Sequence, residues 1–261
     1  MFKRMFVSAV VAGGVAGFLA AALHFAFLQD RLLLAEQYES GALIHFQAAP
    51  AMGHDHAAGE SADHDDAANG EAGHDHSTPQ GAVDGDGHSH SHEPSGGSLG
   101  RNGLTVMFDV LVYVGFAMLL IAGFGAAEAT GRRIGALEGI LWGLGGFAAI
   151  QLAPAMGLAP ELPGTPAAAL GARQVWWWMT VLCTAGGLGL LAYGRGMALA
   201  AAGVALLALP HLIGAPEADG YAGVAPPELA AEFAARALGI GAIAWAFLGW
   251  FASRLWSDKP A

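Results

Sequence analysis

The chain has 261 residues, of which 54% are hydrophobic and only 13% are charged, whereas a soluble domain carries about 25% charged residues. Its formal net charge of −11 arises almost entirely between residues 48 and 100, where ten carboxylates stand without a lysine or arginine. Since the rest of the chain is almost neutral and has no basic face, the composition predicts a membrane protein and argues against nucleic-acid binding.

Missing residue types argue against several kinds of chemistry. The two lysines, Lys3 and Lys259, lie at the ends of the chain, so an internal GxxxxGK[ST] loop for ATP hydrolysis is absent. The single cysteine, Cys183, lies in an apolar segment and is interpreted as a small buried hydrophobe. We find no nucleophile–base pair, HExxH or haem motif, and therefore expect neither an enzyme nor a prosthetic group.

Apolar segments predict an all-α polytopic membrane protein with six transmembrane helices, at residues 7–28, 104–127, 134–153, 175–193, 197–213 and 233–255. The fifth helix is short. We expect a first transmembrane helix within residues 1–30, an extracytoplasmic His/Asp-rich loop over 31–103, and a five-helix membrane bundle over 104–261. Residues 1–22 also fit a cleaved signal peptide, which would leave five helices. Because the apolar run continues to Leu28, we favour an uncleaved helix.

The distribution of cations predicts the orientation in the membrane, since cytoplasmic loops are enriched in lysine and arginine. A cytoplasmic N-terminus and six helices place the C-terminus and seven of the eleven cations on the cytoplasmic side, namely Lys3, Arg4, Arg132, Arg133, Arg195, Arg254 and Lys259. The opposite side then receives the His/Asp-rich loop and two connections rich in acid, proline and glycine.

Small and aromatic residues mark packing positions. Gly13-x-x-x-Gly17 and Gly139-x-x-x-Gly143 permit close approach of helices. The tryptophans at 176–178 begin the fourth helix, which is typical of an interfacial aromatic belt, with a ligand contact as the alternative. Residues 153–161 and 209–217 share a proline followed, after five residues, by Pro-Glu. These motifs indicate either two parallel structural repeats or a chance similarity.

The loop after the first helix carries eight of the eleven histidines, in GHDH at 53–56 and 73–76, DHDD at 63–66 and HSHSH at 88–92. Imidazole and carboxylate bind borderline and hard divalent cations, and the Gly/Ser/Ala spacers predict a loop that is disordered without metal. We interpret the loop as an external metal collector, with an inert hydrophilic spacer as the alternative. Its predicted ligands are His54, His56, His64, His74, His76, His88, His90 and His92. Open histidine sites follow the Irving–Williams order, so selectivity requires a more rigid site.

Polar residues at membrane depth are candidates for that site, because a charge there costs about 2.5–3.5 kcal/mol on insertion scales. The predicted outer ends of the helices carry His24, Asp109, Gln151 and His211, and two carboxylates follow just outside, Glu161 and Glu217. Pro154 and Pro210 free backbone carbonyls that also ligate hard cations. Together these groups predict an entrance site of nitrogen and oxygen ligands.

Each candidate also has a structural interpretation. His24 can snorkel or hydrogen-bond to a neighbouring helix, and Asp109 can cap a helix or pair with Arg101. At the inner end, Glu128 and Glu138 flank Arg132 and Arg133. They form either a cytoplasmic ion-pair gate or ordinary salt-bridged helix ends, of which we favour the second.

Several long motifs resemble the CbtA family of predicted cobalt transporter subunits. They are QDRLLLAEQYE at 29–39, LAPAMGLAPELPG at 152–164, GARQVWWW at 171–178 and LALPHLIGAPE at 207–217. The resemblance covers nearly the whole chain except the His-rich loop. It implies a bacterial inner-membrane protein that takes up cobalt for cobalamin synthesis, commonly with CbtB, a small single-span partner with a histidine-rich end. The long loop of this chain, periplasmic in that setting, would replace or supplement the partner's histidines.

The residues and the resemblance together predict a transporter subunit that moves a divalent metal, Co²⁺ first, inward across the membrane. His211 and Glu161 lie in the matching motifs and are the first candidate ligands. A nickel or zinc transporter, an exporter, and a membrane metal sensor or metallochaperone that does not translocate its metal are the alternatives. The energy source is not visible in the sequence; moving two charges inward at 100 mV is worth about 4.6 kcal/mol.

Overall fold

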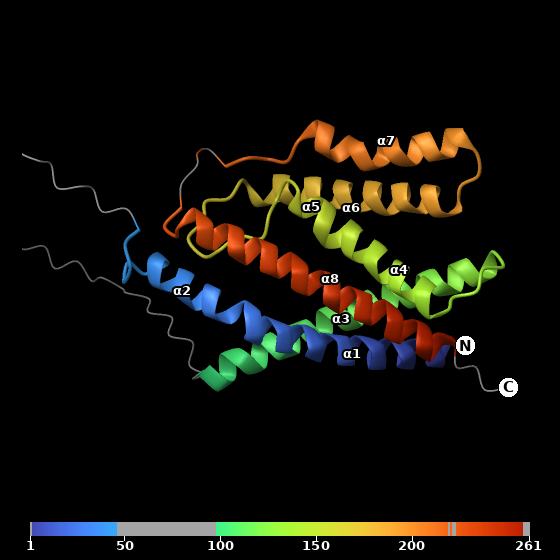
Figure 1. The fold of residues 1–261 in the computed structure, drawn as a ribbon, viewed down its shortest axis with the longest axis horizontal. Coiled ribbons are helices and arrows are strands. Elements are labelled where there is room, and N and C mark those ends of the chain that lie inside the picture. Colours follow the sequence, from blue (N-terminus) through green and yellow to red (C-terminus); the bar gives the residue numbers. More distant parts are fainter. Residues whose placement is uncertain (1, 46–97, 219, 221–222, 258–261) are drawn as a thin grey trace, which may run out of the picture. The chain divides into compact units, whose positions relative to one another are not determined.

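The computed structural model describes residues 2–45, 98–218, 220 and 223–257, so the eight histidines predicted as loop ligands lie outside the described residues. Every regular element within the described part is a helix, which confirms the all-α fold (Figure 1). In chain order these elements are α1 (Phe2–Phe27), α2 (Gln29–Glu39), α3 (Ser98–Ala129), α4 (Ala136–Phe147), a π-helix (Ala148–Leu152), α5 (Ala153–Ala155), α6 (Leu170–Tyr193), α7 (Met197–Ile213) and α8 (Pro227–Ser257).

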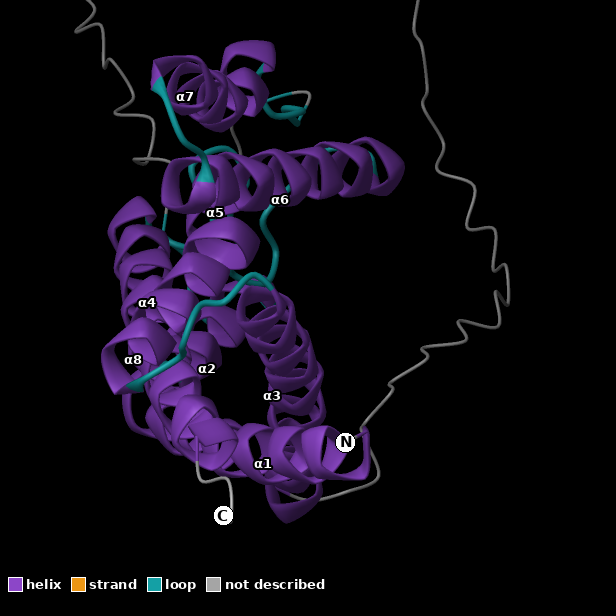
Figure 2. Cartoon of the chain, turned by 90° about the vertical axis from the view of Figure 1, so that its right-hand side faces the viewer, coloured by secondary structure: helices purple, strands orange, loops and turns teal. Residues whose placement is uncertain are grey.

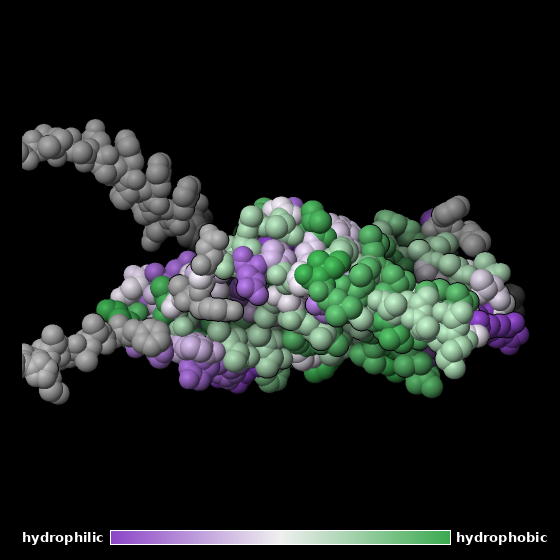
Figure 3. Space-filling view, turned by 90° about the horizontal axis from the view of Figure 1, so that it is seen from above, coloured by the Kyte–Doolittle hydropathy of each residue, from purple (hydrophilic) through white to green (hydrophobic). Residues whose placement is uncertain are grey.

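Five stretches in the described residues are long and apolar enough to cross a membrane: Met5–Phe27, Leu99–Ala129, Ala136–Ala155, Leu170–Tyr193 and Pro227–Ser257. Helix α7 is apolar but shorter, as predicted for the fifth helix. Large hydrophobic side chains cover the outer surfaces of these helices, and the space-filling view shows them as a broad hydrophobic region (Figure 3). A lipid environment is the solvent that suits this surface.

The first glycine pair brings α1 against α3. A Cβ atom built on Gly13 would overlap the backbone of Val114, and one on Gly17 would overlap the backbone of Val110. The two backbones therefore touch at both glycines, four residues apart, as the spacing predicted. Ala9, Ala12, Ala16 and Ala20 of α1 are buried along the same contact, so small residues form this whole face.

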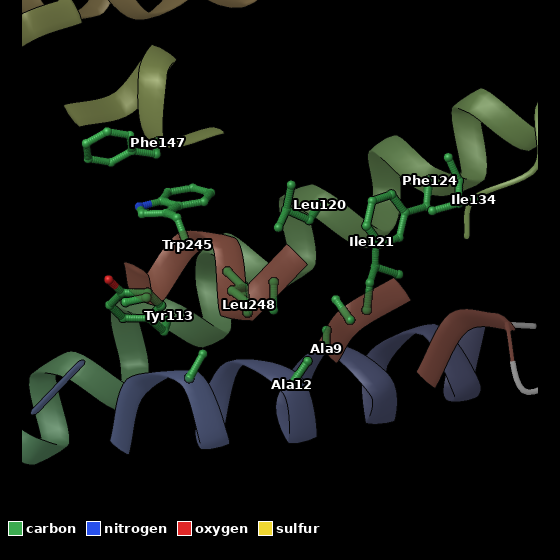
Figure 4. Packing of buried hydrophobic residues seen from close by; sticks show 14 of the residues in the cluster. Ala9, Ala12, Tyr113, Leu120, Ile121, Phe124, Ile134, Phe147, Trp245 and Leu248 are labelled. Carbon is green, nitrogen blue, oxygen red and sulfur yellow. The ribbon is translucent and has the colours of Figure 1, made fainter. Parts of the chain in front are cut away.

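The second glycine pair brings α4 against α8. A Cβ atom on Gly143 would overlap the carbonyl oxygen of Trp245, and Gly139 stands equally close to Ser253 and Gly249. Beside this contact lies the main core, in which α3, α4 and α8 bury large side chains against one another and against the alanines of α1 (Figure 4). Trp245 is its largest fully buried side chain and stacks on Phe116, with ring centroids 4.4 Å apart.

Helices α6 and α7 form a hairpin that packs on the side of this core (Figure 2). Gly187 of α6 and Gly203 of α7 face each other, and a Cβ atom on Gly187 would lie 2.8 Å from the Gly203 carbonyl oxygen. Helix α6 also contacts α4, the π-helix and α5, whereas among the described helices α7 packs against α6 alone. Among these helices, the hairpin therefore contacts the core through α6 and not through α7.

Pro154 explains the π-helix between α4 and α5. A proline has no N–H and its ring clashes with the carbonyl four residues earlier, so it distorts the α-helix in the turn before it. The backbone widens over Ala148–Leu152, and the N–H of Ala153 bonds to the carbonyl of Ala148, five residues back. The predicted helix thus exists, but it carries a bulge of the kind often found at functional positions.

Helix α2 was not predicted, because its segment was assigned to the long loop. Its eleven residues have negative mean hydropathy, so they gave no membrane signal. Ala35 of α2 is fully buried in a second apolar cluster with Leu28, Leu162, Leu229 and Phe233. This cluster ties the end of α1 to the start of α8 and to the α5–α6 connection.

Candidate metal entrance

The sequence-predicted entrance residues lie toward one end of the helices, which we call the α2 end. Here α2 meets the starts of α3 and α8 through contacts of Gln29 with Asn102 and of Arg31 with Glu232. The connections that follow α5 and α7 reach the same end, since a Cβ atom on Gly164 would contact both Glu39 and Val224. The opposite end, which we call the Arg132 end, carries the α3–α4 and α6–α7 turns and the end of α8.

His24 of α1 and Asp109 of α3, both among the described residues, lie on two helices in close contact, near enough to interact electrostatically but without an ion pair between them. Gly17 of α1 packs against the Asp109 backbone. The Asp109 Oδ2 atom is buried and has no hydrogen-bond partner among the described residues. Such an oxygen carries an unrecovered desolvation cost. An unsatisfied carboxylate oxygen beside an imidazole is suited to binding a cation.

The structural alternatives for Asp109 find no support in its surroundings. Arg101, the expected partner, instead places Nη1 at 3.4 Å from Glu36 Oε2. Asp109 also lies well inside α3 rather than at its first turn, so it is no helix cap. The buried Tyr113, one turn further along α3, lies near enough to interact electrostatically with Asp109.

His211 lies in the last turn of α7 and is half-buried. Its ring stands edge-on to Trp176 of α6, with ring centroids 6.2 Å apart. The Trp176 indole Nε1 donates a buried hydrogen bond of 3.2 Å to the carbonyl of Pro210. A carbonyl adjacent to His211 is thereby fixed to α6, which holds this turn of α7 in place.

The hydrogen bond of Trp176 gives it a different role from that of Trp178. Trp178 is 59% exposed and suits an aromatic belt, whereas Trp176 is 4% exposed and is a packing residue of the hairpin. A Cβ atom on Gly157 would contact both Ala215 and Trp176. The two similar proline motifs, 153–161 and 209–217, therefore meet at Trp176.

His211 also lines a pocket of about 370 Å³ with Met156 and Thr184, the remaining lining being Ala153, Val204, Leu207 and Ala208. The Thr184 Oγ1 atom is buried without a hydrogen-bond partner among the described residues. Thr180, one turn earlier, donates to the Trp176 carbonyl at 2.9 Å in the usual way. An imidazole, a thioether and a spare hydroxyl thus belong to one pocket.

Sequence reasoning missed both Met156 and Thr184. Thr184 could have been found as a hydroxyl inside an apolar helix, but methionine is common in apolar segments and gives no such signal.

The remaining candidates are placed differently. Glu161 is bound by Arg173, with Nη2 at 2.9 Å from Oε2, and Glu217 is exposed in the α7–α8 connection. Gln151 belongs to the π-helix and lies over Gly241 of α8. Within the described residues no three His, Cys, Asp or Glu side chains gather closely enough to hold a metal. His24 and Asp109 lie on α1 and α3, whereas His211 lies on α7, which packs against α6.

The four cations that the sequence analysis placed on the outer side are all in ion pairs at the α2 end. Arg31 and Arg236 share Glu232, Arg101 pairs with Glu36, and Arg173 pairs with Glu161. Arg236 also donates to the Phe27 carbonyl at 3.0 Å, which satisfies the C-terminus of α1. The positive charge of this end is therefore balanced locally by carboxylates.

At the Arg132 end, the Glu138 side chain caps α4. Its Oε2 accepts a hydrogen bond of 3.1 Å from the Gly135 N–H, and Arg132 lies over the Tyr193 ring at 5.1 Å from its centroid. A helix cap rather than a gate is the local role that these contacts support for Glu138.

The comparison with known families decides the identity. The sequence model of the family described as probable cobalt transporter subunit (CbtA) matches residues 2–257. The chain belongs to the CbtA family. The match spans α1 to α8 and confirms the resemblance seen in the motifs. No curated protein and no solved structure matched significantly.

Membership in the CbtA family makes this chain a membrane protein of cobalt transport. The description of the family as a subunit implies that it works with a partner subunit and with a metal ion as substrate. The chemistry at the α2 end has to be interpreted in that setting.

Proposed function

We propose that this CbtA chain takes up divalent metal, Co²⁺ foremost, across the bacterial inner membrane to supply cobalamin synthesis. The observation that carries the proposal is the family match over residues 2–257. It is supported by imidazole and carboxylate groups inside otherwise apolar helices, where such groups are costly and mark ion pathways.

The termini are proposed to be cytoplasmic and the His-rich loop periplasmic. The Arg132 end carries Lys3, Arg132, Arg133, Arg195 and Arg254, as the positive-inside rule expects of a cytoplasmic side. The arginines of the α2 end are neutralised in ion pairs. In this orientation the His-rich loop and the α2 end share the periplasmic side.

Metal entry begins at the loop and continues at His211. The loop histidines, which lie outside the described residues, collect the ion. His211 is the central ligand of the entrance, Glu161 and Glu217 extend it, and His24 with Asp109 provides a second polar position. To bind the metal, Glu161 must release Arg173. The arriving dication then takes the place of the guanidinium at the same carboxylate.

A small single-span subunit of the CbtB kind is the proposed partner. The family description as a subunit supports a partner in general. A second metal-binding chain would supply ligands that a two-residue cluster such as His24–Asp109 lacks.

The decisive experiment measures cellular metal by mass spectrometry in cells that do or do not express the chain, over a panel of Co, Ni, Zn, Mn and Cu. We expect selective cobalt accumulation, and we expect His211→Ala to abolish it even at high external cobalt. Leu212→Ala is the matched control, since Leu212 is 82% exposed on the same turn and should keep uptake.

Four outcomes would contradict the proposal or a part of it. Depletion of a metal would indicate export, and preferential nickel or zinc accumulation would reassign the substrate. Metal bound to the purified chain without cellular accumulation, even with a CbtB-like subunit co-expressed, would indicate a sensor or metallochaperone. A fully active His211→Ala variant would remove His211 from the entrance.

The role of the loop is tested separately by deleting residues 52–93. A collector raises the local metal concentration, so the deletion should lower uptake at scarce cobalt and spare it at high cobalt. Equal loss at both concentrations would show that the loop is not a collector.

A further inference from the structure

A second cavity, unrelated to the metal entrance, lies between α3, α4, α6 and α8. Its volume is about 500 Å³, within the range of about 300–1,000 Å³ typical of small-molecule sites. Apolar side chains supply most of its wall, among them Leu120, Leu141, Val181 and Leu188. Gly145 and Gly189 also line it, and a Cβ atom on either would meet no atom within 4 Å. The space beside these glycines is therefore open.

The polar part of this cavity, which we call the groove, is confined to the Arg132 end. Arg132, Glu138 and Tyr193 are its polar side chains there, and Trp142 stands behind them with its ring centroid 6.2 Å from that of Tyr193. Arg132 and Glu138 are both exposed. Glu138 uses Oε2 for the Gly135 N–H, and its other carboxylate oxygen, Oε1, can accept a further hydrogen bond.

We propose that this groove is a binding site for a phospholipid with an ethanolamine headgroup. One acyl chain lies along the apolar wall, the phosphate meets Arg132, and the ammonium group donates to Glu138. A groove between membrane helices is filled by lipid, and a guanidinium is a strong phosphate ligand. The pairing of one cation with one carboxylate matches a headgroup that carries both opposite charges.

Charge also disfavours the other common headgroups at this site. A purely anionic headgroup would bring negative charge next to Glu138, and a choline headgroup has no N–H to donate to the carboxylate. Because acyl chains find an apolar environment anywhere in the bilayer, selectivity at this site rests on the headgroup. The test must therefore compare headgroups on identical chains.

The experiment is native mass spectrometry of the purified full chain, delipidated and then titrated with ethanolamine, choline and glycerol phospholipids that share the same acyl chains. We expect the ethanolamine lipid to bind about tenfold more tightly than the choline lipid, the difference that one charge-assisted hydrogen bond supplies. Equal binding of these two, or tighter binding of the anionic glycerol lipid, would overturn the assignment.

Three substitutions locate the site. Glu138→Gln should remove the preference for ethanolamine over choline, and Arg132→Gln should weaken all three lipids. Gly189→Leu should fill the groove and abolish the lipid adduct that remains bound to the protein. Gly239→Leu is the control and should keep the adduct, because Gly239 is an exposed and open position of α8 outside the groove. Gly145→Leu repeats the filling test from α4 in case Gly189→Leu does not fold. If lipid adducts persist in both Gly189→Leu and Gly145→Leu, the lipid is annular, and the groove is not a specific binding site.

Discussion

Two glycines of α4, only two residues apart, have opposite surroundings. Gly143 faces α8, where a Cβ atom would overlap the Trp245 carbonyl oxygen, whereas Gly145 faces the open groove. The sequence predicted the first through its GxxxG spacing, but nothing in the spacing distinguishes the second from a packing glycine. Residue identity thus indicated that helices approach closely, and only the structure shows which glycines make the contact.

This difference predicts opposite effects of the same substitution. Gly143→Ala should destabilise the chain by about 1–3 kcal/mol, because a methyl group must push α4 away from α8. Gly145→Ala should leave stability unchanged or raise it slightly, since alanine favours helix. The thermal unfolding temperature of the detergent-purified variants measures both. Equal unfolding temperatures for the two variants would show that close contact between α4 and α8 at Gly143 does not contribute to stability.

The entrance residues show where residue-level prediction stops. His24 and Asp109 were predicted from the cost of polar groups at membrane depth, and the structure places them on α1 and α3, two helices that pack closely together. The partner of Glu161 was not predicted, because Arg173 lies twelve residues away across an irregular connection whose path the sequence does not specify. Thr184 gains its significance from a missing hydrogen bond, which is a property of the folded backbone.

At the scale of elements, α2 combines polar contacts at its edges with a small apolar anchor. Arg31 Nε lies 3.2 Å from Glu232 Oε2, and Arg101 Nη1 lies 3.4 Å from Glu36 Oε2. Both pairs are partly exposed and contribute little each, so the buried Ala35 and Leu28 provide the apolar anchor. Because α2 has only a small apolar face, the search for long apolar segments missed it, whereas that search found the long helices.

We therefore expect Glu232→Gln to loosen α2 without unfolding the helices of the main core. Glu232 accepts from Arg31 of α2 and from Arg236 of its own helix, so its neutralisation removes the ion pair that joins α2 to α8. Hydrogen–deuterium exchange should become faster in α2 and stay unchanged in α4. Glu228→Gln, one turn earlier in α8, is the control. Unchanged α2 exchange in Glu232→Gln would show that the apolar cluster alone holds this helix.

At the scale of the whole molecule, α7 carries the chain from one end of the helices to the other although it has only 17 residues, about 25 Å of helix. Met5 at the start of α1 and Trp256 at the end of α8 both lie near Gly125, so these two helix ends are neighbours. Helix α8 begins at the α2 end, and α6 ends at the Arg132 end. Helix α7 must therefore return the chain between them.

The path places the α5–α6 connection and the end of α3 at opposite ends, so the proposed orientation is testable with the single cysteine removed. In a Cys183→Ala background, Ala167→Cys in the α5–α6 connection should react with a membrane-impermeant maleimide in spheroplasts. Thr130→Cys at the end of α3 should react only after the membrane is permeabilised. The reverse pattern would place the His-rich loop in the cytoplasm and favour export.

The attachment of α7 through α6 alone has a consequence for how the protein responds to ligands. Helix α6 contributes Thr184 to the His211 pocket, and it contributes Val181, Leu188 and Gly189 to the groove between α3, α4 and α8. A rocking motion of the α6–α7 hairpin against α4 and α5 would change both volumes in one step. By thermodynamic linkage, a ligand that prefers one hairpin position in either cavity must then alter affinity in the other to the same extent.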